Sequence, residues 1–227
     1  MTAIYFITGT DTGIGKTVLT ALLVRHLRAS GVRAMAVKPL CSGGRYDARI
    51  LRRAQRNALT LDEINPWHFR APLAPLLAAR REQLTVKRAD MLRFIRATAE
   101  KCEVLLVEGA GGLLTPLGEN FDARDLILEL RAKPIVVSSN RLGTINQVRL
   151  VLAALPKVVA NSAQVVLMAT SRPNQATRTN LKLLGEFVSG ERVNLIPRLA
   201  WPTVLNRQRF PADLTRALGR LSIRTGS

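Results

Sequence analysis

The sequence predicts an α/β fold in which a doubly wound, mostly parallel sheet carries helices on both of its faces. Short apolar runs rich in β-branched residues alternate with stretches of helical periodicity, and this alternation implies right-handed crossovers between parallel strands. Glycine-rich or polar segments directly follow several of the runs, as they do in ligand-binding sheets of this kind. The length of 227 residues suits one sizeable domain, so we expect a single domain over residues 1–227.

Six strands are predicted from runs whose composition is typical of strands covered on both faces. The first run, AIYFIT, leads into a glycine-rich segment, and the third, VLLVEG, has the clearest strand character. The second, RAMAVKP, and the last, VNLIP, each end in a proline, which cannot donate a hydrogen bond to a neighbouring strand. In chain order, the expected strands are residues 3–8, 33–39, 104–109, 134–139, 164–170 and 193–197.

Helices are predicted between these strands. The first stops at Ser30-Gly31, a helix-end signal, and the second opens near Asp47, an acid that suits a helix N-terminus. The segment 59–85 contains prolines and little periodicity, so we expect it to be irregular and to pack over an edge of the sheet. In chain order, the expected helices are residues 16–29, 47–56, 87–101, 122–130, 144–155, 178–188 and 211–221.

The composition is unusual in its formal charge of +18, from 34 lysines and arginines against 16 acidic residues. These basic residues are spread over most predicted helices without interleaved aromatics, and this pattern favours a solvated basic surface over a nucleic-acid-binding surface. The size of the charge nevertheless leaves nucleic-acid binding open.

The two cysteines, Cys41 and Cys102, lie outside any paired motif, which fits a reducing compartment. With no basic leader and no apolar stretch of about 18 residues, the sequence predicts a cytoplasmic protein without a membrane segment.

The first strand leads into a candidate phosphate-binding loop, GTDTGIGKT, at residues 9–17. Five residues separate Gly9 from Gly15, whereas the usual pattern has four, so a ligand-free glycine turn is the alternative. A strand before the loop and a helix after it favour the phosphate loop and a fold of the P-loop NTPase type. The predicted nucleotide-binding residues of this loop are Gly13, Ile14, Gly15, Lys16, Thr17 and Val18.

Two further strand ends carry polar residues. Lys38 closes the second strand, and its charge suits it either to stabilise a transferring phosphoryl group or to hold an anionic substrate; an ordinary surface lysine is the alternative. Ser42, in the same loop, is a candidate hydrogen-bond donor. Glu108 closes the third strand, where a buried carboxylate requires a cation: magnesium, or in the alternative a nearby arginine. Asp47 is a second candidate magnesium ligand. The loop after Glu108 adds the candidate nucleotide contacts Gly109, Ala110 and Gly111.

Other chemistries find little support. His26 falls within the first predicted helix and His68 within the irregular segment, and neither has a cysteine or a metal-spaced carboxylate nearby. A G-x-S-x-G hydrolase motif is absent from the sequence. Phosphate chemistry is therefore the function class that the residues support.

These motifs resemble those of the dethiobiotin synthetase family. The segments GTDTGIGKT, KPLCSGG, VEGAGG and LGTIN follow one another in the family's order, and the resemblance extends from Ile4 to about Ile196. The family's own phosphate loop reads Gly-Thr-Asp-Thr-x-x-Gly-Lys-Thr, so the extra residue between Gly9 and Gly15 is a family feature.

The resemblance implies a reaction that depends on ATP and Mg²⁺. In it, 7,8-diaminopelargonate takes up CO2, supplied as bicarbonate, to form a carbamate; ATP activates the carbamate as a carbamic-phosphoric anhydride, and the second amine closes the cyclic urea. By the family's roles, Lys16 binds phosphate, Lys38 stabilises the carbamate and the transferring phosphoryl group, and Thr12 and Ser42 position the substrate. The implied magnesium ligands are Thr17, Asp47 and Glu108.

The resemblance also implies a homodimer with the substrate between subunits. The segment LGTIN opens a predicted helix and is implied to hold the substrate carboxylate across that interface; its residues are Leu142, Gly143, Thr144, Ile145 and Asn146.

The base-binding region departs from the family pattern. Pro197 and Arg198 fall where the family contacts the base, and the Arg198 guanidinium is suited to stacking on a purine. Many members read the adenine edge with an asparagine at the positions that hold Met168 to Thr170 here. Gly13 likewise stands where many members have glutamate. The sequence therefore leaves the base preference open, with Thr170 or Asn174 as possible substitutes for the asparagine.

The principal alternative function is a partitioning-type ATPase switch, of the ParA or MinD kind, that binds DNA through its basic surface. The charge of +18 favours this alternative. Such proteins usually carry a second lysine early in the phosphate loop, whereas this loop reads Thr10-Asp11-Thr12. A third possibility is an amidoligase with an attached glutaminase domain, for which 227 residues leave no room.

Overall fold

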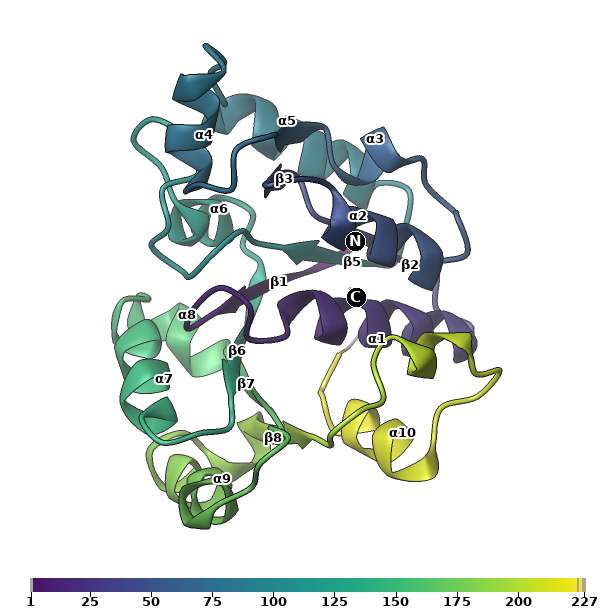
Figure 1. The fold of residues 1–227 in the computed structure, drawn as a ribbon, viewed down its shortest axis with the longest axis vertical. Helices are drawn as coiled ribbons and strands as arrows, with labels where there is room; N and C mark the ends of the chain where they lie inside the picture. Colours follow the sequence, from purple (N-terminus) through teal and green to yellow (C-terminus); the bar gives the residue numbers. More distant parts are fainter. Residues whose placement is uncertain (1, 224, 226–227) are drawn as a thin grey trace.

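The computed structural model describes residues 2–223 and residue 225 of the chain, drawn in Figure 1. The strands are β1 (Ala3–Gly9), β2 (Ala34–Val37), β3 (Leu40–Ser42), β4 (Trp67–Phe69), β5 (Val104–Glu108), β6 (Lys133–Ser139), β7 (Gln164–Met168) and β8 (Val193–Ile196). The α-helices are α1 (Lys16–Ala29), α2 (Tyr46–Ala54), α3 (Leu61–Ile64), α4 (Pro75–Arg81), α5 (Arg88–Ala99), α6 (Ala123–Glu129), α7 (Thr144–Ala153), α8 (Lys157–Ser162), α9 (Gln175–Phe187) and α10 (Ala212–Gly219). Two short 3₁₀ helices, η1 (Gly190–Arg192) and η2 (Thr203–Asn206), complete the described elements.

Over the described residues, the main sheet has six parallel strands in the order β2-β5-β1-β6-β7-β8. In Figure 1, α1 and α10 lie on one side of this sheet and α7 and α8 on the other. All five residues of β5 are buried, as expected for a strand that helices cover on both faces. The predicted doubly wound α/β fold is confirmed.

The register of the three neighbouring strands β2, β5 and β1 brings their carboxyl ends together. Val37, the last residue of β2, lies opposite Val107 of β5, and Ile7 of β1 lies opposite Glu108. Lys38 therefore follows β2 at the level where β5 ends in Glu108. The loop that leaves β1 after Gly9 runs over the same edge. Ligands of doubly wound sheets bind at this edge, beyond the carboxyl ends of the strands.

The structure corrects the expected strand over residues 33–39 and the irregular segment over residues 59–85. The expected strand is shorter, since β2 spans only Ala34–Val37, and a further strand, β3, follows Pro39 and pairs in parallel with β4 outside the main sheet. The segment expected to be irregular contains α3, β4 and α4. It does lie beside the β2 edge, because the Lys38 backbone N–H donates to the Ile64 carbonyl at 3.0 Å.

Two helices differ from the sequence-based expectation in the second half of the chain. Helix α9 begins at Gln175, three residues before the expected start at Arg178, because the Asn174 side chain caps the Thr177 N–H and Thr177 bonds back to Asn174. Helix α8 was not expected at all. It is a six-residue element that follows Pro156, a length too short for a clear helical period.

A buried amide holds α2 against the free side of β2. Gln55, at the end of α2, is fully buried; its Nε2 donates to the Ala36 carbonyl at 2.9 Å and its Oε1 accepts from the Ala36 N–H at 3.1 Å. These bonds satisfy the N–H and carbonyl groups of Ala36, which no strand among the described residues pairs with because β2 is an edge strand. Because α2 also carries Asp47, the contact positions that carboxylate near Lys38.

Replacing Gln55 with leucine tests this anchor. The Gln55→Leu variant leaves the N–H and carbonyl of Ala36 buried without partners, so we expect the free energy of unfolding to fall by about 2 to 4 kcal/mol. Urea denaturation measures the change. The matched variant Gln175→Leu, at an exposed position, should stay within about 0.5 kcal/mol of the wild type. Equal stability of the two variants would contradict the anchoring role.

Candidate active site

The phosphate loop adopts a conformation that requires its glycines. Gly13 and Gly15 have φ angles of 73° and 102°, a region that other residues enter only with strain. A Cβ atom on Gly9 would lie 2.4 Å from the Ile14 Cδ1 and 3.0 Å from the Val137 carbonyl oxygen, so a larger residue there would have to displace the Ile14 side chain. Gly15 begins α1 without a side-chain cap, which leaves the first N–H groups of this 14-residue helix free for an anion.

Lys16 folds back over the phosphate loop. Its side chain is buried, and its Nζ donates to the Asp11 carbonyl at 2.6 Å. Burial lowers the pKa of Lys16 from 10.5 to about 8; the Glu108 carboxylate opposes this change and the Lys38 ammonium adds to it. An anion bound in the loop would favour the charged form of this lysine.

Lys38 is the centre of a charge cluster in which Glu108 is also buried and Asp47 and Thr17 are half-buried. Its Nζ donates to Glu108 Oε1 at 2.7 Å and also to the Asp47 carboxylate. The Thr17 hydroxyl donates to the same Glu108 oxygen at 2.6 Å. Burial by itself would lower the pKa of Lys38, but the carboxylates of Glu108 and Asp47 outweigh burial and hold it above its usual value.

The second oxygen of Glu108 lacks a partner among the described residues. Glu108 Oε2 is buried and accepts no hydrogen bond from any described group, which is costly for a carboxylate. An oxygen-seeking cation beside Thr17, Asp47 and Glu108 would satisfy it. The described residues hold no group of three His, Cys, Asp or Glu side chains suited to a metal. One or two carboxylates with a hydroxyl fit Mg²⁺, which takes its remaining ligands from water and phosphate.

Two cavities meet at Lys38. The first, of about 360 Å³, has the phosphate loop as one wall; its lining residues are Thr12, Gly13, Gly15, Lys16, Thr17, Val18, Lys38, Tyr46, Asp47, Ile50, Glu108, Gly111 and Trp201. The second, of about 620 Å³, is lined by Thr12, Lys38, Leu40, Cys41, Ser42, Gly44, Asp47, Pro72, Leu73, Ala74, Pro75, Ala110, Gly111 and Thr115. Their shared residues are Thr12, Lys38, Asp47 and Gly111. A group bound in one cavity can therefore reach a group bound in the other beside the Lys38 ammonium.

The loop after β5 is shaped by close packing. Gly111 has a φ of 66°, and a Cβ atom there would lie 2.3 Å from the Thr115 hydroxyl. That hydroxyl accepts the Gly112 N–H at 2.9 Å. Gly109 lies against the Phe6 ring, 3.0 Å from where its Cβ would be. Small residues therefore let Ala110 and Gly111 form a wall of the second cavity.

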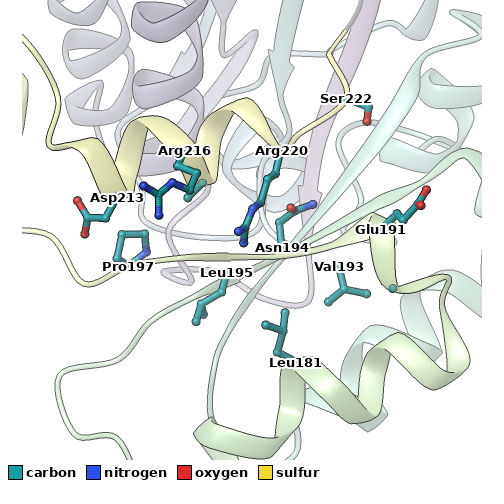
Figure 2. A pocket seen from close by; sticks show the side chains of 12 residues that line it. Leu181, Glu191, Val193, Asn194, Leu195, Pro197, Asp213, Arg216, Arg220 and Ser222 are labelled. Atoms are coloured by element: carbon teal, nitrogen blue, oxygen red, sulfur yellow. The ribbon is translucent and has the colours of Figure 1, made fainter.

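The structure places several expected site residues outside both cavities. Pro197 lines a separate cavity at the outer side of β8, shown in Figure 2, and Arg198 is not among the residues that line either active-site cavity. The segment 142–146 is likewise absent from both linings. In it, Leu142 is 78% exposed and Gly143, with a φ of 89°, begins α7. Thr144 is buried, and its hydroxyl donates to the Ser139 carbonyl.

Sequence reasoning missed the aromatic residues of the first cavity. Trp201 and Tyr46 both line it, as does Ile50. Met168 packs against Gly15, with its Cγ 3.0 Å from where a Gly15 Cβ would be. The chain has only two tryptophans and an aromatic fraction of 4%, so a tryptophan in the loop after β8 was itself a usable signal.

Comparison with known proteins bears on this geometry. A family model described as "AAA domain" matches residues 4–205. The ATP-dependent dethiobiotin synthetase BioD of Akkermansia muciniphila is 34% identical over 197 residues, covering 82% of this chain and 92% of that protein. The enzyme of the same name from Anaeromyxobacter dehalogenans (strain 2CP-C) is 37% identical over 210 residues, covering 90% and 93%, and that of Bacillus subtilis (strain 168) is 32% identical, covering 96% and 99%.

The chain belongs to the dethiobiotin synthetase family. The resemblance seen in its motifs is thus confirmed over most of its length, and with it the expectation that the protein is an enzyme that uses ATP. No helix among residues 2–223 is both long and apolar enough to cross a bilayer.

Solved structures share the fold of this dethiobiotin synthetase family member. The ParA protein of pNOB8, solved bound to nonspecific DNA, superimposes with a TM-score of 0.57 at 13% identity, covering 97% of each chain. The cell division protein MinD of Aquifex aeolicus gives 0.55 at 17% identity, covering 99% of this chain and 100% of that one. At these identities the likeness shows the fold alone.

Removing the Lys38 ammonium tests the charge cluster. The Lys38→Met variant leaves the buried Glu108 carboxylate without its cation, so we expect the ligand-free protein to lose about 3 to 5 kcal/mol of stability. The Lys38→Met/Glu108→Leu double variant removes both charges and should recover most of that loss. Urea denaturation of the three proteins gives the comparison. A single variant as stable as the wild type would rule out the buried pair.

Proposed function

We propose that the protein closes the ureido ring of dethiobiotin from 7,8-diaminopelargonate and CO2, at the expense of ATP and with Mg²⁺. The observation that carries the proposal is the position of Lys38, whose ammonium lies where the phosphate-loop cavity meets the second cavity. A carbamate formed in the second cavity and a triphosphate in the first would both contact this cation. Family membership supports the reaction class, and the junction of the two cavities supports Lys38 as the place of phosphoryl transfer.

The proposed reaction runs in three balanced steps. One amine of the substrate attacks CO2, forming an N–C bond and releasing a proton to give a carbamate. A carbamate oxygen attacks the γ-phosphorus of ATP, and ADP leaves, so a carbamic-phosphoric anhydride results. The second amine then attacks the carbonyl carbon, and phosphate leaves as the ring closes and a proton is released. Lys38 stabilises the carbamate and the transferring phosphoryl group throughout.

The nucleotide-side residues are proposed to act through charge and position. Lys16 and the N–H groups of residues 13–18 bind the outer phosphates at the beginning of α1. Thr17, Asp47 and Glu108 would hold Mg²⁺, which when bound neutralises charge on the phosphate oxygens. In the ligand-free protein the Lys38 ammonium is the cation between Asp47 and Glu108, so the same carboxylates serve either cation.

The substrate is proposed to lie in the second cavity, with Thr12 and Ser42 positioning it. The Ser42 hydroxyl now donates to the Leu73 carbonyl at 2.7 Å, and its oxygen can still accept a hydrogen bond from a substrate amine. The segment 142–146 lines neither cavity of its own chain, which suits the proposal that it binds the substrate carboxylate across a homodimer. Free N–H groups at the beginning of the ten-residue helix α7 would provide the donors.

The nucleobase is proposed to stack on Trp201. This tryptophan lines the same cavity as Gly15 and Thr17. Residues 168–170, where many family members carry the adenine-reading asparagine, lack it here, and Met168 packs on Gly15. Stacking on an aromatic face tolerates any base, because every base has a π-face. We therefore expect the protein to discriminate only weakly among nucleotide bases. Pro197 and Arg198 stay predicted contacts at the outer side of the base.

The central test is a phosphate-release assay. With 7,8-diaminopelargonate, bicarbonate and Mg-ATP, the purified protein should release phosphate only when the diamine is present. The Lys38→Ala variant should bind nucleotide but lose turnover by about 10³-fold or more, because it lacks the cation at the point of transfer. Lys182→Ala, at an exposed position on α9, is the matched control. Release that ignores the diamine contradicts this function and favours a nucleotide switch.

Tryptophan fluorescence tests the stacking proposal. The Trp67→Phe variant leaves Trp201 as the only tryptophan; Trp67 packs edge-on against Phe94, 5.8 Å between ring centroids, and lines neither cavity. ATP, GTP and CTP should each quench its emission, whereas tripolyphosphate, which lacks a base, should bind without comparable quenching. Equal responses to tripolyphosphate and ATP, or calorimetric ATP binding without quenching, would remove Trp201 from the base site.

A further inference from the structure

A cavity of about 750 Å³ lies at the outer side of β8, between α10 and the segment that includes α9 and η1 (Figure 2). Its lining residues are Leu181, Gly190, Glu191, Val193, Asn194, Leu195, Pro197, Asp213, Arg216, Ala217, Arg220 and Ser222. It shares none of them with the two cavities that meet at Lys38. β8 is the last strand of the sheet, so within the described residues no strand pairs with its outer side.

The α10 side of this edge cavity is rich in hydrogen-bond donors. Arg216 and Arg220 are one helical turn apart on α10, and in Figure 2 the Arg220 guanidinium lies beside the Asn194 amide. Asn194 is 5% exposed, and its Nδ2 has no hydrogen-bond partner among the described groups. A buried amide donor without a partner is costly unless a ligand accepts from it.

The two acidic residues of the edge cavity lie at its opposite ends, with Arg220 and Asn194 between them (Figure 2). Asp213 lies beside Arg216, three residues away on α10, whereas Glu191 lies at the far end of the cavity. In the described part of the chain, neither Arg216 nor Arg220 forms an ion pair. Two guanidinium groups without an ion pair therefore line this cavity, and an oxyanion beside Arg220 would also lie near the buried Asn194 amide.

The α9 side of the same cavity is apolar. Side chains alternate along β8, so Val193 and Leu195 point away from Asn194 and toward α9, where Leu181 lies (Figure 2). Leu195 is 36% exposed despite its size. The edge cavity thus has two halves on either side of β8: a half with hydrogen-bond donors toward α10 and an apolar half toward α9.

We propose that this edge cavity binds an amphipathic anion, with its oxyanion head on Arg216, Arg220 and Asn194 and its aliphatic chain on Leu181 and Leu195. A carboxylate and a phosphate monoester offer the same acceptor chemistry to these donors, and the apolar half selects for an alkyl chain attached to either head. The residues proposed to bind the head and the chain take no part in the proposed ring closure; Pro197, a predicted base contact, is the one lining residue that both proposals name.

Isothermal titration calorimetry with four probes tests the proposal on the wild-type protein. Octanoate and octyl phosphate carry both head and chain, whereas 1-octanol lacks the charge and acetate lacks the chain. We expect octanoate or octyl phosphate to bind about tenfold or more tightly than 1-octanol and acetate, and their relative affinities identify the preferred head. No measurable binding of either amphipathic anion, or equally tight binding of 1-octanol, overturns the proposal.

Two pairs of substitutions locate the bound probe. Arg216→Gln/Arg220→Gln should weaken binding of the better probe about tenfold or more, because the charge-assisted bonds to its head are lost. The matched pair Arg178→Gln/Lys182→Gln removes two charges one turn apart on the exposed face of α9 and should leave the affinity within about twofold. Equal effects of the two pairs, or no effect of either, would place the probe elsewhere and overturn the assignment.

A third variant tests the apolar half of the edge cavity. Leu195→Ser should weaken octanoate several-fold while leaving the weak response to acetate unchanged, because only the chain contacts that side chain. Phosphate release with the diamine should be unchanged in all three of these variants, since none alters a residue that lines the cavities at Lys38. An effect of Leu195→Ser on acetate equal to that on octanoate counts against a divided site.

Discussion

The buried carboxylate of Glu108 is the constraint on which the rest of the candidate active site depends. It ends a strand covered on both faces, so its charge must be balanced within the protein. The nearest balance is the Lys38 ammonium, 2.7 Å away, with the Thr17 hydroxyl on the same oxygen. The second oxygen, Oε2, has no partner within the described chain, and this is why we propose that the carboxylate also binds Mg²⁺.

Strand order brings these groups together. β5 lies between β2 and β1, so the segments that follow β2 and β1 must both pass the end of β5. Lys38 comes from one side and the phosphate loop from the other. Buried Gln55 then fixes α2 on the free side of β2, which brings Asp47 to the same cation. Strand pairing and the Gln55 amide thus determine where the Lys38 ammonium meets the carboxylates of Glu108 and Asp47.

The sequence predicted that these groups converge because its signals are local: a buried strand that ends in Glu108, a lysine before Pro39 and a glycine loop before a helix. The expected partner of Glu108 was magnesium or an arginine, whereas the structure pairs it with Lys38. The sequence did not predict the second small sheet after Pro39, since an apolar pattern does not report which strands pair. Trp201 and the edge cavity at β8 were also missed. Both arise from packing between segments distant in sequence, which periodicity cannot report.

The most direct measurement is a crystal structure with a non-hydrolysable ATP analogue and Mn²⁺, whose anomalous signal locates the cation. The account predicts a single anomalous peak in contact with Glu108 and the Thr17 hydroxyl, with the outer phosphates against Lys16 and within reach of Lys38. A peak or a triphosphate bound away from the carboxyl ends of β1, β2 and β5 would contradict it.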